Sequence, residues 1–277
     1  MKAKIINFLI RLMVQAIFII FSITILFALY YLIINALKSE PEFYQSQFAL
    51  PSKIDINRIK DVWVDGNIGR AFKNSLIMGS STVLIVIPIG ALAGYAFSNF
   101  KFKHNTLLYM SVISTMYFSP MILIIPIFLI YSKIMLVNTY IGTIIIYSGI
   151  NLAFGIFLLT TFFRGIPDEI IEAATIDGAS RFQILKSIII PLSTPAIFTL
   201  GLMVFYNVWN DLIIGVIFMQ KPEYKPIMAA ISQFRGKWDS NNTAIFLGAL
   251  IATIPIMLIY GFAQKYFIRG MTLGSIK

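Results

Sequence analysis

Long apolar runs constrain this chain more than any other feature of its sequence. A helix needs about 20 apolar residues to cross the hydrocarbon core of a bilayer. Because unpaired backbone groups cannot face lipid, such runs must be helical. The sequence therefore predicts an all-α polytopic membrane protein with six transmembrane helices, at Leu12–Leu37, Leu76–Phe97, Leu107–Ile130, Ile141–Phe163, Ile188–Met219 and Ala244–Phe267.

Composition supports the membrane class. Hydrophobic residues make up 58% and charged residues 12%, whereas a soluble domain carries roughly 25% charged residues. The fifth run is overlong and holds Pro191 and Pro195, so its span is expected to start nearer Pro195.

The sequence lacks the residues that several kinds of catalytic or binding site require. The chain has no cysteine and one histidine, His104, so thiol catalysis and Cys- or His-based metal sites are not expected. The one Gly-Lys pair, Gly236–Lys237, is followed by Trp238 and not by the Ser or Thr of a phosphate-binding loop. The net charge of +10 comes mostly from residues that flank apolar runs. We interpret these basic residues as contacts to lipid headgroups and not to nucleic acid.

The loop between the fourth and fifth runs concentrates acidic residues and helix-ending signals. Its carboxylates are Asp168, Glu169, Glu172 and Asp177. Gly178 is placed to end a first short helix, and Ser180 with Gln183 forms a capping box that starts a second. Pro191 is expected to interrupt the chain before the next span.

One face of the first short helix is suited to docking. Ile170, Ala173, Ala174 and Asp177 fall at positions i, i+3, i+4 and i+7, and the two alanines would allow another surface to approach closely. A solvated loop with an amphipathic helix at the membrane interface would show the same pattern. Pattern alone leaves both interpretations open.

The same loop carries a resemblance to a known family. Glu172, Ala173, Ala174, Gly178, Ile188, Ile190 and Pro191 are spaced as in the EAA loop of ABC importer permeases, which usually have Leu where this chain has Ile190. The string EAATIDGAS resembles the carbohydrate-uptake branch, and within it the second permease of maltose-type importers.

Other stretches agree with this resemblance in the expected order. They are FKNSL (72–76), AGYAFSNFKFK (93–103), VNTYIG (137–142), WND (209–211) and QKYFIRGMTLGSIK (264–277). The family's tail usually ends in a further glycine, which this chain lacks. The resemblance runs from about Phe72 to the end of the chain. It implies a transmembrane core at residues 72–277, preceded by residues 1–71 with the first helix and an external loop.

The resemblance implies a mechanical role for residues 165–190 as a cytoplasmic coupling loop. In such permeases the EAA helix inserts into a cleft on a separate ATP-hydrolysing subunit, so ATP and Mg would be bound by that partner and this chain would be no enzyme. Glu172 is expected to make a charged contact there. The coupling residues would be Glu169, Glu172, Ala173, Ala174, Asp177, Gly178, Ser180 and Pro191.

The implied assembly has several partners in a cell membrane. They are a second permease subunit, an ATPase dimer and an external sugar-binding protein. Both termini would be cytoplasmic, although Lys and Arg divide evenly between the two sides. Phe234 and Trp238, in the loop at 220–243, would be natural anchors for the binding protein. An ordinary polar loop would look the same.

Polar residues within the apolar runs are candidates for a carbohydrate pathway. Asp211 is an acid inside a predicted span, where a charge is costly and often functional. Amides and aromatic faces suit sugar hydroxyls and C–H faces, whereas capping or pairing at a helix break would use the same residues. The candidates are Tyr117, Asn151, Tyr206, Asn207, Trp209, Asn210 and Asp211, with Ser119 as a weaker one.

Three alternatives remain open at this point. A permease for a sugar-phosphate such as glycerol-phosphate would show the same coupling loop. An ion-coupled secondary transporter would be expected to hold several intramembrane ionisable residues and inverted repeats, but one acid and no evident repeat are found. A membrane-bound transferase that uses Asp211 is compatible with composition, but the EAA loop argues against it.

Overall fold

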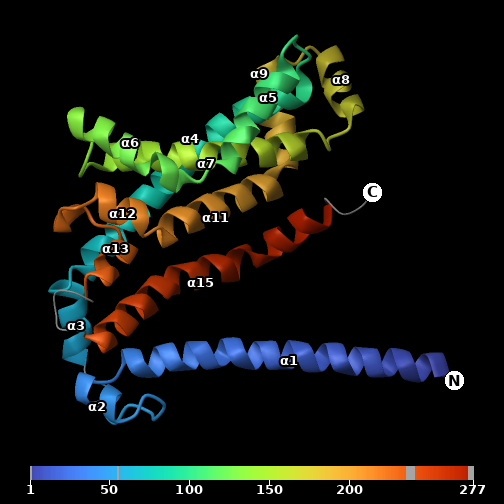
Figure 1. Ribbon diagram of the computed structural model, residues 1–277. Helices are drawn as coiled ribbons and strands as arrows, with labels where there is room; N and C mark the ends of the chain where they lie inside the picture. Colours follow the sequence, from blue (N-terminus) through green and yellow to red (C-terminus); the bar gives the residue numbers. More distant parts are fainter. Residues whose placement is uncertain (1, 55, 235–240, 274–277) are drawn as a thin grey trace. The chain divides into compact units, whose positions relative to one another are not determined.

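The computed structural model is built of helices (Figure 1). It describes the backbone of residues 2–54, 56–234 and 241–273, and the side chains of 7–54, 57–234 and 241–261. No strand occurs among the described residues, which confirms the all-α prediction. The α-helices are α1 (Lys2–Ala36), α2 (Glu40–Gln45), α3 (Ile56–Val64), α4 (Ile68–Asn99), α5 (Asn105–Ser114), α6 (Pro120–Lys133), α7 (Tyr140–Phe163), α8 (Asp168–Ile176), α9 (Arg181–Ile184), α10 (Ile190–Leu192), α11 (Thr194–Asn210), α12 (Ile213–Phe218), α13 (Ile227–Ser232) and α15 (Asn242–Leu273).

Short segments of other helical types complete the chain. Two 3-10 turns, η1 (Thr115–Tyr117) and η3 (Pro222–Tyr224), and one π-helical turn, η2 (Leu185–Ile189), lie between α-helices.

Four of the helices are long and apolar enough to cross a membrane. They are Asn7–Ala36, Ile68–Asn99, Tyr140–Phe163 and Asn242–Gly261. The other two expected spans are each a bent pair of helices, with an angle of 94° between Asn105–Tyr117 and Pro120–Lys133 and of 78° between Arg181–Leu192 and Thr194–Asn210. The chain is thus a multi-pass membrane protein, and the count of six spans stays a prediction.

The bend in the third apolar run, between η1 and α6, has a local cause that a hydropathy average does not detect. Pro120 disfavours helical backbone at the residue before it, and Ser119 is extended, with φ −64° and ψ 127°. Pro120 then opens α6, where its missing N–H costs nothing. The Ser119 hydroxyl accepts a 3.4 Å hydrogen bond from the backbone N–H of Met121 as an N-cap.

The fifth run breaks at two places. Helix α11 begins at Thr194 with Pro195 in its first turn, as the proline positions predicted. Pro191 was expected to interrupt the chain, but it lies inside the short helix α10, and the turn comes at Ser193. The π-helical turn just before Pro191 shifts the hydrogen-bond register, so the helix continues through this proline. Asp211, with φ −71° and ψ 127°, ends α11.

The chain forms two compact units. The first contains Met1–Ile68 and Ile231–Ile254, and the second contains Gly69–Ala230 and Pro255–Lys277. Within the first unit, Glu40 accepts hydrogen bonds from the backbone N–H groups of Asn242 (3.1 Å) and Thr243 (3.2 Å). A carboxylate at a helix N-terminus stabilises the helix. This contact joins the start of α15 to the N-terminal segment, a grouping not expected from the division at residue 71.

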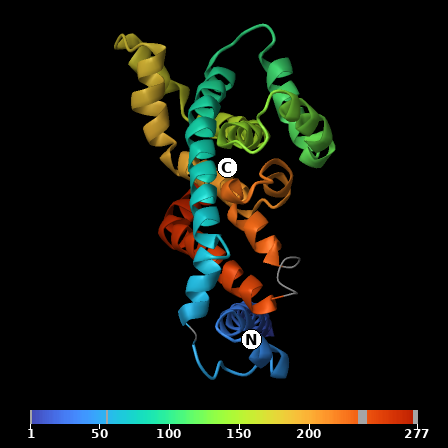
Figure 2. The same ribbon diagram turned by 90° about the vertical axis from the view of Figure 1, so that its left-hand side faces the viewer.

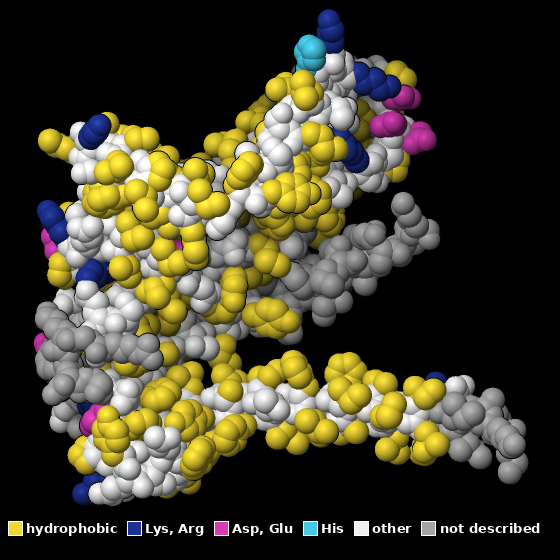
Figure 3. All heavy atoms as spheres, viewed as in Figure 1, with side chains coloured by type: hydrophobic (Ala, Val, Ile, Leu, Met, Phe, Trp, Pro, Cys, Tyr) yellow, Lys and Arg dark blue, Asp and Glu magenta, His cyan; other side chains and the backbone are white. Residues whose placement is uncertain are grey.

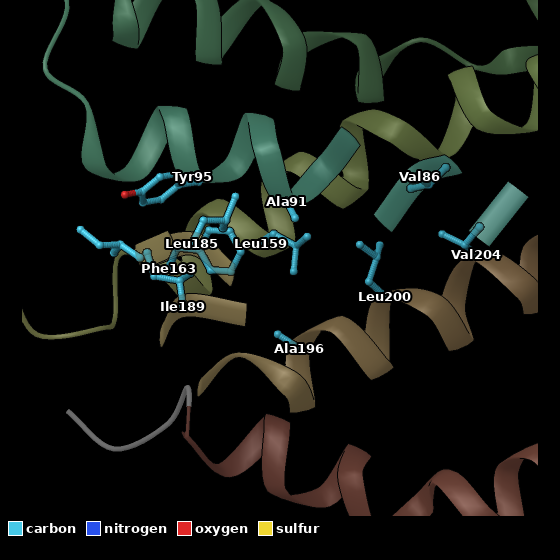
Figure 4. Packing of buried hydrophobic residues seen from close by; sticks show 11 residues of the cluster. Val86, Ala91, Tyr95, Leu159, Phe163, Leu185, Ile189, Ala196, Leu200 and Val204 are labelled. Carbon is cyan, nitrogen blue, oxygen red and sulfur yellow. The ribbon is translucent and has the colours of Figure 1, made fainter. Parts of the chain in front are cut away.

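The core of the second unit lies where α4, α7 and α11 meet (Figures 1 and 2). Figure 4 shows its side chains pointing toward one another from these helices and from the turn before α10. Gly94 of α4 allows a close approach, because a Cβ there would lie 3.1 Å from the backbone N of Thr160 in α7. The buried cluster, here called the core cluster, comprises Val86, Ala91, Tyr95, Leu159, Phe163, Ile184, Leu185, Ile189, Ala196, Leu200 and Val204.

Candidate functional site

The loop between α7 and α11 has the local structure that the sequence predicts. Helix α8 ends at Ile176, and Gly178 follows with φ +81°, in the left-handed region that favours glycine. The Ser180 N–H donates to Gln183 Oε1 (2.7 Å), and the Gln183 N–H donates to Ser180 Oγ (3.4 Å). These bonds form the predicted capping box at the start of α9.

Helix α8 has an inner face that packs and an outer face that is open. Ile171 and Ala174 pack against the core cluster. Glu172 and Ala173 are exposed, and the side chain of Ile176 is 86% exposed. The predicted docking face is therefore divided, since Ala174 turns inward. Ile176 was not singled out from the sequence, because it does not share the spacing of Ile170, Ala173 and Ala174.

The outer face of α8 carries the acidic side chains that the sequence singled out. Figure 3 shows carboxylates, basic side chains and the histidine gathered at the end of the second unit where α5, α8 and α9 lie. Asp168, Glu169 and Asp177 are exposed together with Glu172. This end presents charge together with the exposed apolar side chains of Ile170, Ile176 and Phe182 to whatever binds there.

Two arginines of the loop between α7 and α11 attach it to α4, to α5 and to the connector between those two helices. The guanidinium of Arg181 lies 4.6 Å from the ring centroid of Phe100, and that of Arg164 lies 5.0 Å from the ring of Tyr109. Arg164 Nη2 also donates to the carbonyl oxygen of Phe97 (3.4 Å). Such cation–π contacts contribute about 0.5–1 kcal/mol each at exposed sites. Together with the packing of α8, they attach the loop to the core cluster.

A cavity of about 230 Å³ opens between α6, α7, α11 and α12. It brings together three residues that the sequence proposed for a pathway, Asn151, Asn207 and Asp211, as well as Ser119. The other lining residues are Pro120, Met121, Ile124, Tyr147, Ile150, Ile213 and Ile214.

Two polar pairs join α7 to the C-terminal end of α11 beside this cavity. The Tyr147 hydroxyl donates to Asp211 Oδ1 (3.0 Å), and Asn207 Nδ2 donates to Asn151 Oδ1 (3.0 Å). The members of the two pairs are four residues apart on each helix, which places them on one helical face. Tyr147 was missed in the sequence because tyrosine in an apolar run reads as a packing residue. Its position four residues before Asn151 was the available signal.

Asp211 also holds the start of α12. Its Oδ1 accepts hydrogen bonds from the backbone N–H groups of Ile214 (2.8 Å) and Gly215 (3.3 Å). These are N–H groups that a helix start leaves without an intrahelical partner. Asp211 therefore lines the cavity and caps a helix break, so the two interpretations of this residue are compatible.

The remaining pathway candidates lie elsewhere. The side chain of Tyr117 is 87% exposed and that of Tyr206 is 49% exposed, and neither lines the cavity. Trp209 is 1% exposed, stacked on Phe205 with ring centroids 5.5 Å apart. Asn210 Nδ2 donates to the carbonyl oxygen of Tyr206 (3.0 Å) in its own helix. The roles predicted for these four residues stay predictions.

The predicted anchors for an external protein are only partly described. Phe234 is 6% exposed, and a Cβ at Gly66 would lie 2.8 Å from its Cζ atom, so the ring packs over this glycine within the first unit. A contact with an external protein would require this ring to move. Trp238 lies outside the described residues.

The part of the chain that the structure describes contains no candidate metal site. No group of three or more His, Asp or Glu side chains there is placed to hold a metal ion. The one carboxylate at the cavity, Asp211, stands with amide and hydroxyl groups.

Comparison with known proteins gives the class of this chain. It belongs to the family of binding-protein-dependent transport system inner membrane components, which it matches over residues 86–273. The family match includes α8, α9 and all the lining residues of the cavity.

Individual relatives and a solved structure extend the match. The chain is 29% identical to the probable ABC transporter permease protein YurM of Bacillus subtilis, over 93% of this chain and 86% of the relative. It is 29% identical to the melibiose/raffinose/stachyose import permease protein MelC of Bacillus subtilis, over 90% of each. Its fold matches a chain of a bacterial ABC transporter involved in the import of the acidic polysaccharide alginate, with TM-score 0.79, 24% identity, and coverage of 92% of this chain and 95% of that chain.

Proposed function

We propose that this chain is a transmembrane permease subunit of an ATP-driven importer for a carbohydrate. The observation that carries the proposal is the polar cavity at Asp211, built inside the region that matches the transport family. Carboxylate, amide and hydroxyl groups converge there against walls of Ile and Met, an arrangement that suits a sugar's hydroxyls and C–H faces. The relative named for melibiose, raffinose and stachyose import supports a carbohydrate substrate.

The α8–α9 loop would receive the force from ATP hydrolysis. Its exposed face, with Glu169, Glu172, Ala173 and Ile176, would enter a cleft on a separate ATPase dimer that binds ATP and Mg. The exposed apolar side chain of Ile176, next to Asp177 and one turn after Glu172, resembles an interface anchor beside a polar rim. Gly178 and the Ser180 capping box would keep the loop in one shape during transport.

The motion would reach the cavity through the packing of the second unit. Ile171 and Ala174 of α8 contact the core cluster, and Arg181 contacts Phe100. The same cluster contains Leu159 of α7 and Leu200 of α11, the two helices joined at the cavity by the polar pairs. A displacement of the loop would thus change the relation of α7 to α11 and the access to the cavity.

The proposal fixes the orientation and the partners. The α8–α9 loop would face the cytosol, which places both termini on the cytoplasmic side of the cell membrane. The loop at 220–243 would then lie outside, where a sugar-binding protein docks. A second permease subunit would complete the translocation path, as a heterodimer with this chain.

ATP-dependent uptake in proteoliposomes tests the proposal. The chain would be reconstituted with its second permease and ATPase, and the binding protein would be supplied with labelled melibiose, raffinose or maltose. We expect uptake that requires both ATP and the binding protein. Uptake that continues without ATP and follows an ion gradient would favour a secondary transporter. Uptake of glycerol-phosphate in place of every sugar would favour the sugar-phosphate alternative.

A further inference from the structure

We infer that the cavity at Asp211 selects uncharged saccharides and rejects anionic ones. The inference rests on the proposed function and specifies its substrate class. It follows from the hydrogen bonds that the two carboxylate oxygens of Asp211 make. The Tyr147 hydroxyl and the N–H groups of Ile214 and Gly215 all donate to Oδ1 of Asp211.

The second oxygen of this carboxylate remains available to a ligand. Among the described residues, none donates a hydrogen bond to Asp211 Oδ2, although Asp211 lines the cavity. A carboxylate oxygen accepts hydrogen bonds and donates none when ionised. A sugar hydroxyl is the complementary donor, and bonds to a charged acceptor are the stronger kind.

The rest of the lining suits a neutral sugar. Asn207 and Ser119 add an amide and a hydroxyl, while Ile124 and Ile150 add apolar surface. Asp211 carries the one formal charge among the described lining residues. Because like charges repel, a phosphate or uronate group beside this carboxylate would be disfavoured.

Cationic side chains line a different pocket. Arg70 and Lys73 stand beside Tyr140 and Tyr224, next to Glu223, in a hollow near the first residues of α7. Tyr147, which contacts Asp211, lies two turns further along the same helix. The described lining residues thus place cations in this pocket and none in the cavity at Asp211.

The first test measures the charge of the cavity without knowledge of the natural sugar. This chain has no cysteine, so Ser119→Cys introduces one thiol that mass spectrometry can follow in the assembled complex. Two thiol reagents of similar size would be compared, one cationic (a trimethylammonium ethyl methanethiosulfonate) and one anionic (a sulfonatoethyl methanethiosulfonate). We expect Asp211→Asn to lower the ratio of cationic to anionic reaction rates about tenfold.

Asparagine is a suitable replacement because its side-chain oxygen can still accept the three bonds that Asp211 Oδ1 accepts. Asn210→Asp serves as the control in the opposite direction, since Asn210 does not line the cavity. We expect that variant to change the ratio less than Asp211→Asn does. An unchanged ratio in Asp211→Asn would overturn the inference, because Asp211 would then set no charge in the cavity.

The second test concerns substrates. Proteoliposomes would be supplied with raffinose, maltose and an alginate trisaccharide, each with the binding protein. We expect ATP-dependent uptake of a neutral sugar, with alginate uptake lower by about tenfold or more. Equal ATP-dependent uptake of the alginate trisaccharide would overturn the inference and leave the importer proposal intact. Absence of ATP-dependent uptake for every probe would overturn the importer proposal, and the inference with it.

Discussion

At the residue scale, the carboxylate of Asp211 stabilises a helix start and also lies at the proposed sugar cavity. Asp211 ends α11, caps α12 and lines the cavity. Its importance could be predicted because a charge in an apolar run stands out in any sequence. Its partner Tyr147 could not be found in the same way, because the hydroxyl matters only once the fold brings α7 beside α11.

Replacing Tyr147 with phenylalanine tests the pair. The change removes the hydroxyl that donates to Asp211 Oδ1 and keeps the ring. Interhelical hydrogen bonds in membranes contribute about 0.6 kcal/mol to stability on average. We therefore expect a small loss of stability, and a lower transport rate in an assembled complex because α7 and α11 lose one of their bonds at the cavity. Tyr206→Phe is the matched control, because the Tyr206 side chain does not line the cavity. Equal rates in both variants would show that the Tyr147 hydroxyl has no role in transport.

Replacing Asn207 with alanine tests the second polar pair. Asn151 is 4% exposed, so its Oδ1 would lose the donor from Asn207 in a buried place. An unsatisfied buried group costs about 1–3 kcal/mol. We expect a lower thermal unfolding midpoint in detergent than for Asn210→Ala, whose exposed side chain bonds within its own helix. A midpoint equal to that of this control would mean that the Asn151–Asn207 pair does not stabilise the fold.

At the element scale, local signals predicted the short helices well and the long runs less well. Gly178, Ser180 and Gln183 act within a few residues, so the end of α8 and the start of α9 were found. The break between η1 and α6 was missed because a hydropathy average ignores the conformation that Pro120 imposes on Ser119. The π-helical turn at Leu185–Ile189 has no simple sequence signal, so the interruption was predicted at Pro191, whereas the bend comes two residues later, at Ser193.

The packing of α4 against α7 gives a prediction about glycine. A Cβ at Gly94 would lie 3.1 Å from the backbone N of Thr160, whereas a Cβ at Gly149 would meet nothing within 4 Å. We expect Gly94→Ala to lower stability by about 1–3 kcal/mol through overpacking. The same change at Gly149 should be neutral or slightly stabilising, since alanine favours helix. Thermal unfolding of the two variants would decide, and equal midpoints would contradict a tight α4–α7 contact.

At the scale of the whole molecule, the apolar runs sufficed to identify a multi-pass membrane protein. The grouping of Ile231–Ile254 with the N-terminal segment was not predictable, because it depends on bonds such as Glu40 to Thr243, about two hundred positions apart in the sequence. The cavity was predictable only as a set of separate polar residues. Trp209 shows why, since its aromatic ring suited a sugar but the fold buries it against Phe205.

The central claim is that the α8–α9 loop couples this chain to ATP hydrolysis by a partner. Glu172 is exposed on the loop, and Gly178 has φ +81°, so Gly178→Asp would strain the turn that joins α8 to α9. Asp65→Ala is a control for loss of one exposed carboxylate elsewhere.

The most direct measurement is sugar-stimulated ATP hydrolysis by the reconstituted complex that carries Glu172→Ala or Gly178→Asp in this chain. The account predicts that both variants assemble with the ATPase but lose stimulation and transport, while Asp65→Ala behaves as the unmodified protein does. Full stimulation in both loop variants, with the ATPase still bound, would contradict the coupling role of residues 165–190.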